Sequence, residues 1–380
     1  MNFNLTEEQT QIRDAARDFA VNEIAPSSIE RDITAEFPTE IIKQLGEMGF
    51  MGMMVAPEWG GAGLDTVSYV LAMEEISKVD ASVGVIMSVN NSLVCFGIEK
   101  WGTTEQKEKY LRPLATGQKL GAFCLSEPEA GSDATNQKTE AVKDGDFYVL
   151  NGMKNWITNG TKADYYLIQA QTDKAKGYKG ITTFIVEQTW EGLEVGKKED
   201  KLGIRSSDTC TIGLNNCRVP KENVLGEEGL GFKIAMETLN GGRIGIAAQA
   251  LGIAAASLEA SIKYSKERKA FDEPICNLQA IQFKLADMAV NLETARLLVL
   301  QAALKKDNKE KFAREAAQGK LQASKVAVQN ALEAIQIHGG YGYVREYLVE
   351  RYLRDAKITE IYEGTSEIQK IVIARELLRD

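Results

Sequence analysis

Residues 358–376 read ITEIYEGTSEIQKIVIARE, and this stretch decides how the rest of the chain is interpreted. Ser366 and Gln369 have the spacing of a capping box, and apolar residues follow at helical intervals, so a helix is predicted to begin there. Gly364 permits a tight backbone approach just before that helix. Glu363 is therefore expected in the turn at the helix start, where the helix dipole favours its ionised form and burial its neutral form.

Around this stretch the chain divides into three segments of different character. Residues 1–120 and 226–380 show apolar residues at helical spacing, whereas 121–225 has β-branched and aromatic runs separated by turn dipeptides. The predicted turns are Asp144-Gly145, Asn151-Gly152 and Asn159-Gly160, and the longest predicted helices cover 231–265, 278–305, 310–338 and 366–378. We expect an α+β protein with an N-terminal helical domain (1–120), a central antiparallel β-barrel or sandwich (121–225) and a C-terminal four-helix bundle (226–380).

Composition narrows the class of protein. The chain has 380 residues with a net charge of −9, which disfavours nucleic acid as a partner. Its five cysteines show no CxxC spacing, so we expect no disulfide framework and no metal site, and a reducing cytoplasm fits. His338 is the single histidine, which excludes a Ser-His-Asp triad unless it supplies one. No signal peptide is visible, and the apolar run 244–258 is short for a membrane span.

Taken alone, a glutamate near a helix start is more often a cap or a solvated charge than a base. However, IYEGTSEIQ (361–369) resembles the signature of the acyl-CoA dehydrogenase family, in which the glutamate of YEGT is the catalytic base. Other segments resemble family motifs in the same order: PEWGGAGLD (57–65), FCLSEPEAGSD (123–133), NWITNG (155–160), GIRSSDT (203–209), RKAFDEPI (268–275) and QIHGGYGY (336–343). The chain is identified as a member of that family, most similar to its short-chain, butyryl-CoA dehydrogenase-like members.

The resemblance implies an FAD cofactor and assigns residues to it. Trp156 would pack on the flavin ring, while Ser126 and Thr158 would hydrogen bond to it. The full set of implied contacts on the central domain is Phe123, Leu125, Ser126, Gly131, Ser132, Trp156, Ile157 and Thr158. A neighbouring subunit would supply Arg268, Phe271, Gln279, Gln336, Gly339 and Gly340, and Thr365 and Glu367 would also touch the FAD.

The implied reaction is α,β-oxidation of a short-chain acyl-CoA to a trans-2-enoyl-CoA, or the reverse enoyl-CoA reduction, in fatty acid metabolism. Glu363 would remove the α-proton, and Ser132, Asn240, Arg243, Tyr362 and Gly364 would contact the substrate. An electron-transferring flavoprotein would exchange electrons with the FAD. The enzyme class would be an EC 1.3.8-type oxidoreductase, assembled as a homotetramer (a dimer of dimers). Some relatives carry the base immediately before the arginine of the LNGGR segment, but here Gly242 stands there.

Three departures from the family pattern leave the acyl group open. Asn240 stands where an aspartate is common, Asn90 replaces the histidine of the SVHNSL segment, and Asp272 stands where a glycine is common. An enoyl-CoA reductase for an aryl-propenoyl or other unsaturated thioester is therefore an alternative. An acyl-CoA oxidase and a non-catalytic scaffold of the same fold are further alternatives.

Overall fold

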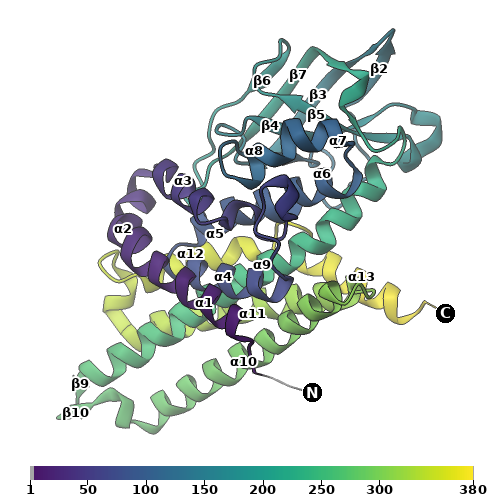
Figure 1. Ribbon diagram of the computed structural model, residues 1–380. Helices are drawn as coiled ribbons and strands as arrows, with labels where there is room; N and C mark the ends of the chain where they lie inside the picture. Colours follow the sequence, from purple (N-terminus) through teal and green to yellow (C-terminus); the bar gives the residue numbers. More distant parts are fainter. Residues whose placement is uncertain (1–3, 380) are drawn as a thin grey trace.

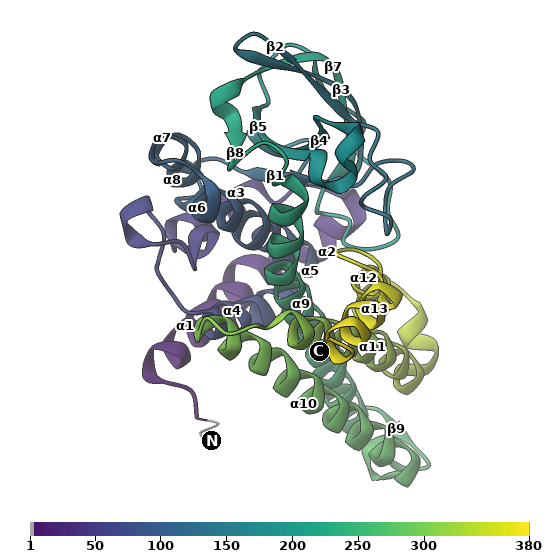
Figure 2. The same ribbon diagram turned by 90° about the vertical axis from the view of Figure 1, so that its right-hand side faces the viewer.

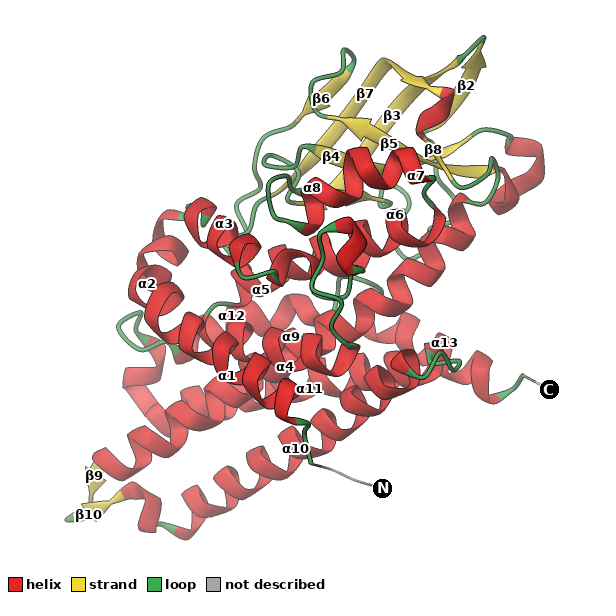
Figure 3. Ribbon diagram, in the orientation of Figure 1, coloured by secondary structure: helices red, strands yellow, loops and turns green. Residues whose placement is uncertain are grey.

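The computed structural model describes residues 4–379 and has the predicted order of a helical, a β and a second helical region (Figures 1 and 3). The N-terminal region begins with a capping box in which Thr6 and Gln9 bond each other's backbone. Its helices are α1 (Glu7–Phe19), α2 (Ala25–Thr34), α3 (Thr39–Glu47), α4 (Thr66–Val79), α5 (Ala81–Ser88), α6 (Phe96–Trp101), α7 (Thr104–Gln106) and α8 (Arg112–Ala115). A π-helical segment, Val89–Cys95, joins α5 to α6 without a break.

The β region forms a single eight-stranded sheet at one end of the molecule (Figures 1 and 2). Its strands are β1 (Gly121–Cys124), β2 (Glu140–Asp144), β3 (Phe147–Thr158), β4 (Tyr165–Gln171), β5 (Ile181–Glu187), β6 (Leu193–Val195), β7 (Thr209–Pro220) and β8 (Val224–Leu225). Most neighbouring strands are antiparallel, as predicted. The sheet is nevertheless mixed, because β1 and one residue of β2 pair with β4 in parallel.

One of the three predicted turns is wrong. The turn predicted at Asp144-Gly145 is present but displaced by one residue, because Asp144 ends β2 and Gly145-Asp146 connect it to β3. Asn159-Gly160 follows the end of β3 as predicted. Asn151-Gly152, however, lies inside β3, where the pairing with β7 shifts register between Leu150 and Gly152. A Cβ on Gly152 would sit 2.6 Å from the Thr139 backbone, so this glycine permits a close approach at a bulge instead of a turn.

The C-terminal region is a bundle around the 37-residue helix α9 (Gly231–Glu267), which runs from the sheet into the helical body (Figures 1 and 2). The other helices are α10 (Gln279–Asp307), α11 (Ala313–His338), α12 (Val349–Thr359) and α13 (Ser366–Leu377). A short hairpin of β9 (Lys269–Ala270) and β10 (Glu273–Pro274) lies at the end of the bundle farthest from the sheet. The four predicted helices are present, whereas α12 was not predicted as a separate helix.

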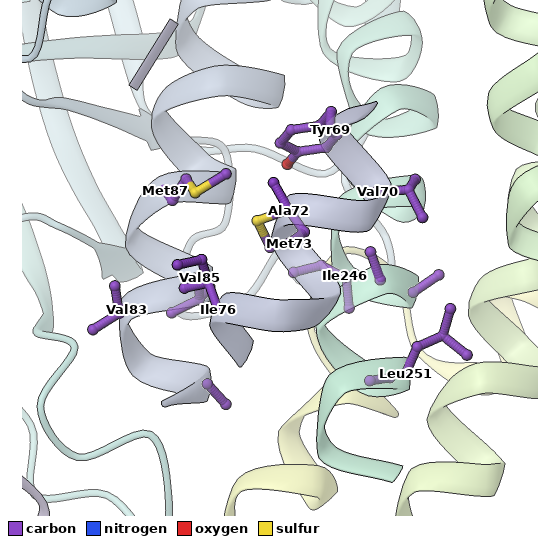
Figure 4. Packing of buried hydrophobic residues seen from close by; sticks show 14 of the residues in the cluster. Tyr69, Val70, Ala72, Met73, Ile76, Val83, Val85, Met87, Ile246 and Leu251 are labelled. Atoms are coloured by element: carbon purple, nitrogen blue, oxygen red, sulfur yellow. The ribbon is translucent and has the colours of Figure 1, made fainter. Parts of the chain in front are cut away.

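The core joins the two helical regions, because α4 and α5 pack directly against α9. Figure 4 shows buried side chains of all three helices in this core, with Met73 of α4 beside Ile246 of α9 and Met87 on the neighbouring α5. Two helical stretches, Ala81–Trp101 and Gly231–Glu267, are long and apolar enough to cross a membrane by composition. Their apolar windows are 94% and 83% buried within the fold, which is the pattern of core helices.

Candidate active site

Glu363 lies in the tight turn between α12 and α13. Its φ of 51° and the φ of 93° at Gly364 place two successive residues in the left-handed region. For a non-glycine residue this conformation is strained, and such strain is concentrated at functional sites. The helix begins as predicted, but Thr365 caps it: its hydroxyl accepts from the Ile368 backbone N–H at 3.4 Å. The predicted cap, Ser366, is the first helical residue instead.

The Glu363 carboxylate lies against Gly242 of α9. A Cβ built on Gly242 would sit 2.1 Å from Glu363 Oε2 and 2.7 Å from Leu93 Cδ2, so only glycine leaves room for the carboxylate. Oε2 is buried without a hydrogen-bond partner. An orphaned carboxylate oxygen is costly unless a ligand or substrate uses it. Burial raises the pKa of Glu363 to about 7, and the positive charges of Lys320 and Arg243 act in the opposite direction.

Two side chains donate hydrogen bonds to the backbone carbonyl oxygens of this turn, and the sequence pattern does not predict either bond. Lys320 of α11 donates from Nζ to the Gly364 carbonyl oxygen at 2.7 Å. Gln369 of α13 donates from Nε2 to the carbonyl oxygens of Gly364 (2.8 Å) and Glu363 (3.2 Å). Gln369 therefore secures the turn instead of forming the predicted capping box with Ser366. No sequence pattern singles out Lys320, because a lysine on a long helix is normally a solvated charge.

Two tyrosines near Glu363, Tyr362 and Tyr69, are each held by a hydrogen bond. The Tyr362 hydroxyl donates to Gln249 Oε1, and Gln249 Nε2 donates to the Ala81 carbonyl oxygen at 2.7 Å. Tyr69 donates to Ser88 Oγ at 3.2 Å, and burial raises the pKa of Tyr69 to about 12, with a smaller contribution from Glu363. Tyr362 is thus fixed beside Glu363 by a bond to α9.

Arg243 and Asn240, both predicted to contact the substrate, lie on α9 and bond each other. Arg243 Nη1 donates to Asn240 Oδ1 at 2.7 Å, its Nε is buried without a partner, and burial lowers its pKa to about 10. Because Asn240 is neutral, it offers Arg243 a hydrogen bond but no compensating charge. The structure therefore places an incompletely neutralised guanidinium beside Glu363.

Asn90 and Asp272 are two other departures from the family pattern. Asn90 is fully buried and donates to the carbonyl oxygens of Met51 (2.8 Å) and Leu114 (3.1 Å) while accepting from the Gly121 N–H (3.1 Å). It therefore fastens the start of β1 to the N-terminal helices. Asp272 has a φ of 66°, a conformation that glycine adopts readily and that aspartate also tolerates.

The residues predicted on the central domain gather at β1, β3 and the loop between β1 and β2. Trp156 has a φ of 63° at a second irregularity of β3, and 64% of its surface is exposed. The Asn155 N–H donates to the Ser126 carbonyl oxygen at 2.9 Å, which brings the loop beside that strand. Phe123, Ser126 and Thr158 are half-buried, Leu125 is buried, and Gly131 and Ser132 are exposed. The Ile157 side chain is buried in the core of the sheet, so any contact of this residue with a ligand would come from its backbone.

A buried ion pair that was not predicted supports this loop. Lys154 Nζ contacts Glu127 Oε1 at 2.7 Å and also donates to the Leu125 carbonyl oxygen at 3.2 Å. Glu127 in turn accepts from the N–H groups of Lys138 and Thr139. These contacts hold both ends of the loop that carries Ser126, Gly131 and Ser132.

The remaining predicted residues lie at the opposite end of the molecule, near the β9–β10 hairpin (Figures 1 and 2). A cavity of about 510 Å³ there is lined by Arg268, Gly339 and Gly340 together with Tyr264, Ile275, Ile337, His338, Tyr341 and Val344. Phe271 is 86% exposed, and Gln279 and Gln336 are also exposed. This group is far from the sheet, so a role in the FAD site of a neighbouring subunit stays a prediction.

The last two residues predicted to contact the FAD, Thr365 and Glu367, lie at the start of α13. Thr365 is half-buried and engaged as the cap of α13, and Glu367 is exposed in the first turn of that helix. A carboxylate with a buried, unpartnered Oε2, an exposed tryptophan in a left-handed conformation and a β region between two helical regions fit the flavin-dependent class of oxidoreductases that the sequence resemblance implies.

Comparison with known proteins agrees with this assignment. The N-terminal, middle and C-terminal domains of acyl-CoA dehydrogenases match residues 6–118, 122–217 and 229–378. Similar proteins include the mitochondrial short-chain specific acyl-CoA dehydrogenase of Mus musculus, 54% identical over 99% of this chain and 91% of that protein. The chain therefore belongs to the acyl-CoA dehydrogenase family, whose members are flavoproteins acting on CH–CH bonds.

Solved structures give the same result. Butyryl-CoA dehydrogenase from Megasphaera elsdenii superposes with a TM-score of 0.98 at 50% identity, covering all of both chains. A chain from a structure described as the electron transferring flavoprotein of Acidaminococcus fermentans superposes with a TM-score of 0.99 at 52% identity, also over all of both chains.

Proposed function

We propose that this enzyme oxidises a short-chain acyl-CoA to the trans-2-enoyl-CoA, with Glu363 as the base that removes the α-proton. The observation that carries the proposal is the Glu363 carboxylate, whose Oε2 is buried, unpartnered and fitted over Gly242. A general base works best when its pKa lies near the working pH. Burial places the pKa of Glu363 at about 7, which meets that requirement.

The chain's own groups account for the proton transfer. At neutral pH the carboxylate form of Glu363 is substantially populated, and the fixed turn holds it in one orientation. Lys320 and Arg243 stabilise the negative charge before the proton arrives. The substrate would cover the site and exclude water, which strengthens these interactions.

FAD is the cofactor that fits the residues present. Trp156 offers an exposed aromatic face, and a Cβ at Gly131, Gly339 or Gly340 would meet no atom within 4 Å, so a ligand has room to approach the backbone. The remaining contacts would be those named from the sequence: Phe123, Leu125, Ser126, Ser132, the backbone of Ile157, Thr158, Arg268, Phe271, Gln279, Gln336, Thr365 and Glu367. When bound, the flavin supplies the acceptor for the hydride equivalent lost from the β-carbon.

Similarity supports a short acyl chain and a flavoprotein partner. Compared proteins include a short-chain specific enzyme, a butyryl-CoA dehydrogenase and a chain from a structure described as an electron transferring flavoprotein. We propose the same substrate class and redox partner here, with Ser132, Asn240, Arg243, Tyr362 and Gly364 along the thioester. The cytoplasm is the proposed location.

A homotetramer is the proposed assembly. Helix α10 carries Phe283, Val290, Leu297 and Leu304 at intervals of seven residues, and each is more than half exposed. Such a stripe on one helix face is typical of a surface covered by another helix. A second copy of this chain would cover it and bring the Arg268 cavity to the FAD of its neighbour.

Anaerobic titration with a panel of CoA thioesters tests the proposed reaction. Butyryl-CoA is expected to bleach the flavin absorbance of the purified holoenzyme more completely than longer acyl chains. An aryl-propenoyl-CoA added to the reduced enzyme tests the reductase alternative, and peroxide formed in air tests the oxidase alternative. A flavin that no acyl-CoA bleaches would refute the proposal.

A further inference from the structure

Lys320 is a buried lysine whose ammonium bonds a carbonyl instead of a carboxylate. Its side chain is 0% exposed on α11, and Nζ donates to the Gly364 carbonyl oxygen at 2.7 Å. Burying an ammonium is costly unless nearby charges or hydrogen bonds compensate it. The bonded carbonyl belongs to the residue directly after Glu363, so the lysine is attached to the strained turn itself.

We infer that Lys320 is a positioning residue for the base: it fixes the Glu363–Gly364 turn and places a buried positive charge beside the carboxylate. This inference rests on the proposed function and extends it to a residue outside the predicted site. Gln369 supplies a second hydrogen bond to the same Gly364 carbonyl, at 2.8 Å, but carries no charge. Both donors therefore hold the Gly364 carbonyl in place, but of these two only Lys320 also adds a positive charge near Glu363.

The charges around the turn support this division. Facing Glu363 are Lys320 from α11, Arg243 from α9, Tyr69 from α4 and the adjacent Tyr362, and Arg375 of α13 acts on Arg243. Glu360 and Glu367 act on Lys320 from the ends of α12 and α13. Lys320 is the first of the two cations that lower the pKa of Glu363 against the effect of burial.

The lysine is charged under working conditions. Burial lowers its own pKa to about 8, with Glu363 opposing that change. The ammonium is thus mostly protonated at neutral pH, where Glu363 would act. Removing a positive charge at close range raises a carboxyl pKa by about one unit or more.

The experiment compares Lys320→Met with Gln369→Met and with Lys325→Met in the FAD-loaded holoenzyme. Lys320→Met and Gln369→Met each remove one donor to Gly364, but only the first removes a charge. Lys325 is an exposed lysine on the same helix and serves as the matched control. Gln369 still bonds the Gly364 carbonyl in Lys320→Met, so that acceptor keeps a hydrogen-bond donor. If Lys320→Met does not fold, Lys320→Gln is measured in its place.

The first readout is the protonation of Glu363 in substrate-free enzyme, measured by infrared difference spectra against Glu363→Gln across pH. Lys320→Met is expected to raise the Glu363 pKa by about one unit, with Gln369→Met and Lys325→Met unchanged. An unchanged pKa in Lys320→Met, or an equal rise in Gln369→Met, would overturn the inference. This readout needs no turnover, so it stands apart from the thioester titration that tests the proposed function.

The second readout is the acid limb of the kcat/KM profile. In Lys320→Met the limb should move to higher pH by the same interval, giving roughly a tenfold loss of activity below the original midpoint. A uniform loss at every pH would indicate a purely structural role and would contradict the electrostatic part.

Discussion

Gly242→Ala is the most informative single substitution because it adds one methyl group directly against the base. The new Cβ would lie 2.1 Å from Glu363 Oε2 and 2.9 Å from its Cδ. To restore an ordinary 3.4 Å contact the carboxylate must retreat by about 1.3 Å. A misplacement of about 1 Å costs about 100-fold in rate, so kcat is expected to fall by about two orders of magnitude.

The assay is stopped-flow reduction of the flavin by butyryl-CoA, with thermal unfolding measured in parallel. Gly241→Ala is the matched control: its Cβ would meet only Lys306 Nζ and Ser92 O, both at 3.9 Å. The control should keep wild-type flavin reduction and gain up to about 1 kcal/mol of stability from helix propensity. If Gly242→Ala reduced its flavin as fast as Gly241→Ala, the close contact between α9 and the base would be refuted.

The other predictions concern charge and cofactor. The base must be deprotonated to act, and burial raises the pKa of Glu363 to about 7, so kcat/KM should rise with pH to a plateau above that value; a limb near 4.5 would contradict the burial. Asn240→Asp would compensate the charge of Arg243, so the same limb should move to higher pH, and a downward move would refute this electrostatic reasoning. Trp156→Ala should lower the flavin content of the purified protein, measured by absorbance, whereas Met153→Ala on the same strand should not.

Much of the architecture could be predicted because it depends on local patterns. The long helices follow from apolar spacing, and the hairpin at Gly145 follows from a two-residue turn. The turn predicted at Asn151-Gly152 is wrong because the same dipeptide occurs in turns and in bulges, and only the contact with Thr139, directly before β2, distinguishes them. Long-range packing decides that case.

The site could be predicted only in part for the same reason. The YEGT motif locates Glu363, but its surroundings come from residues far apart in sequence, such as Gly242 and Lys320. A lysine in a helix gives no signal of burial, since the charge is normally solvated. Thr365 in place of Ser366 as the cap is a displacement of one residue, within the usual uncertainty of a helix end.

Glu363 is proposed to remove the α-proton of a CoA thioester. This role can be tested by the incorporation of deuterium from solvent at the α-carbon of butyryl-CoA, measured by mass spectrometry with wild-type holoenzyme and with Glu363→Gln. The wild type should exchange the α-hydrogen, and the variant should bind FAD and thioester yet incorporate almost none. Exchange at the wild-type rate in Glu363→Gln would show that another group is the base.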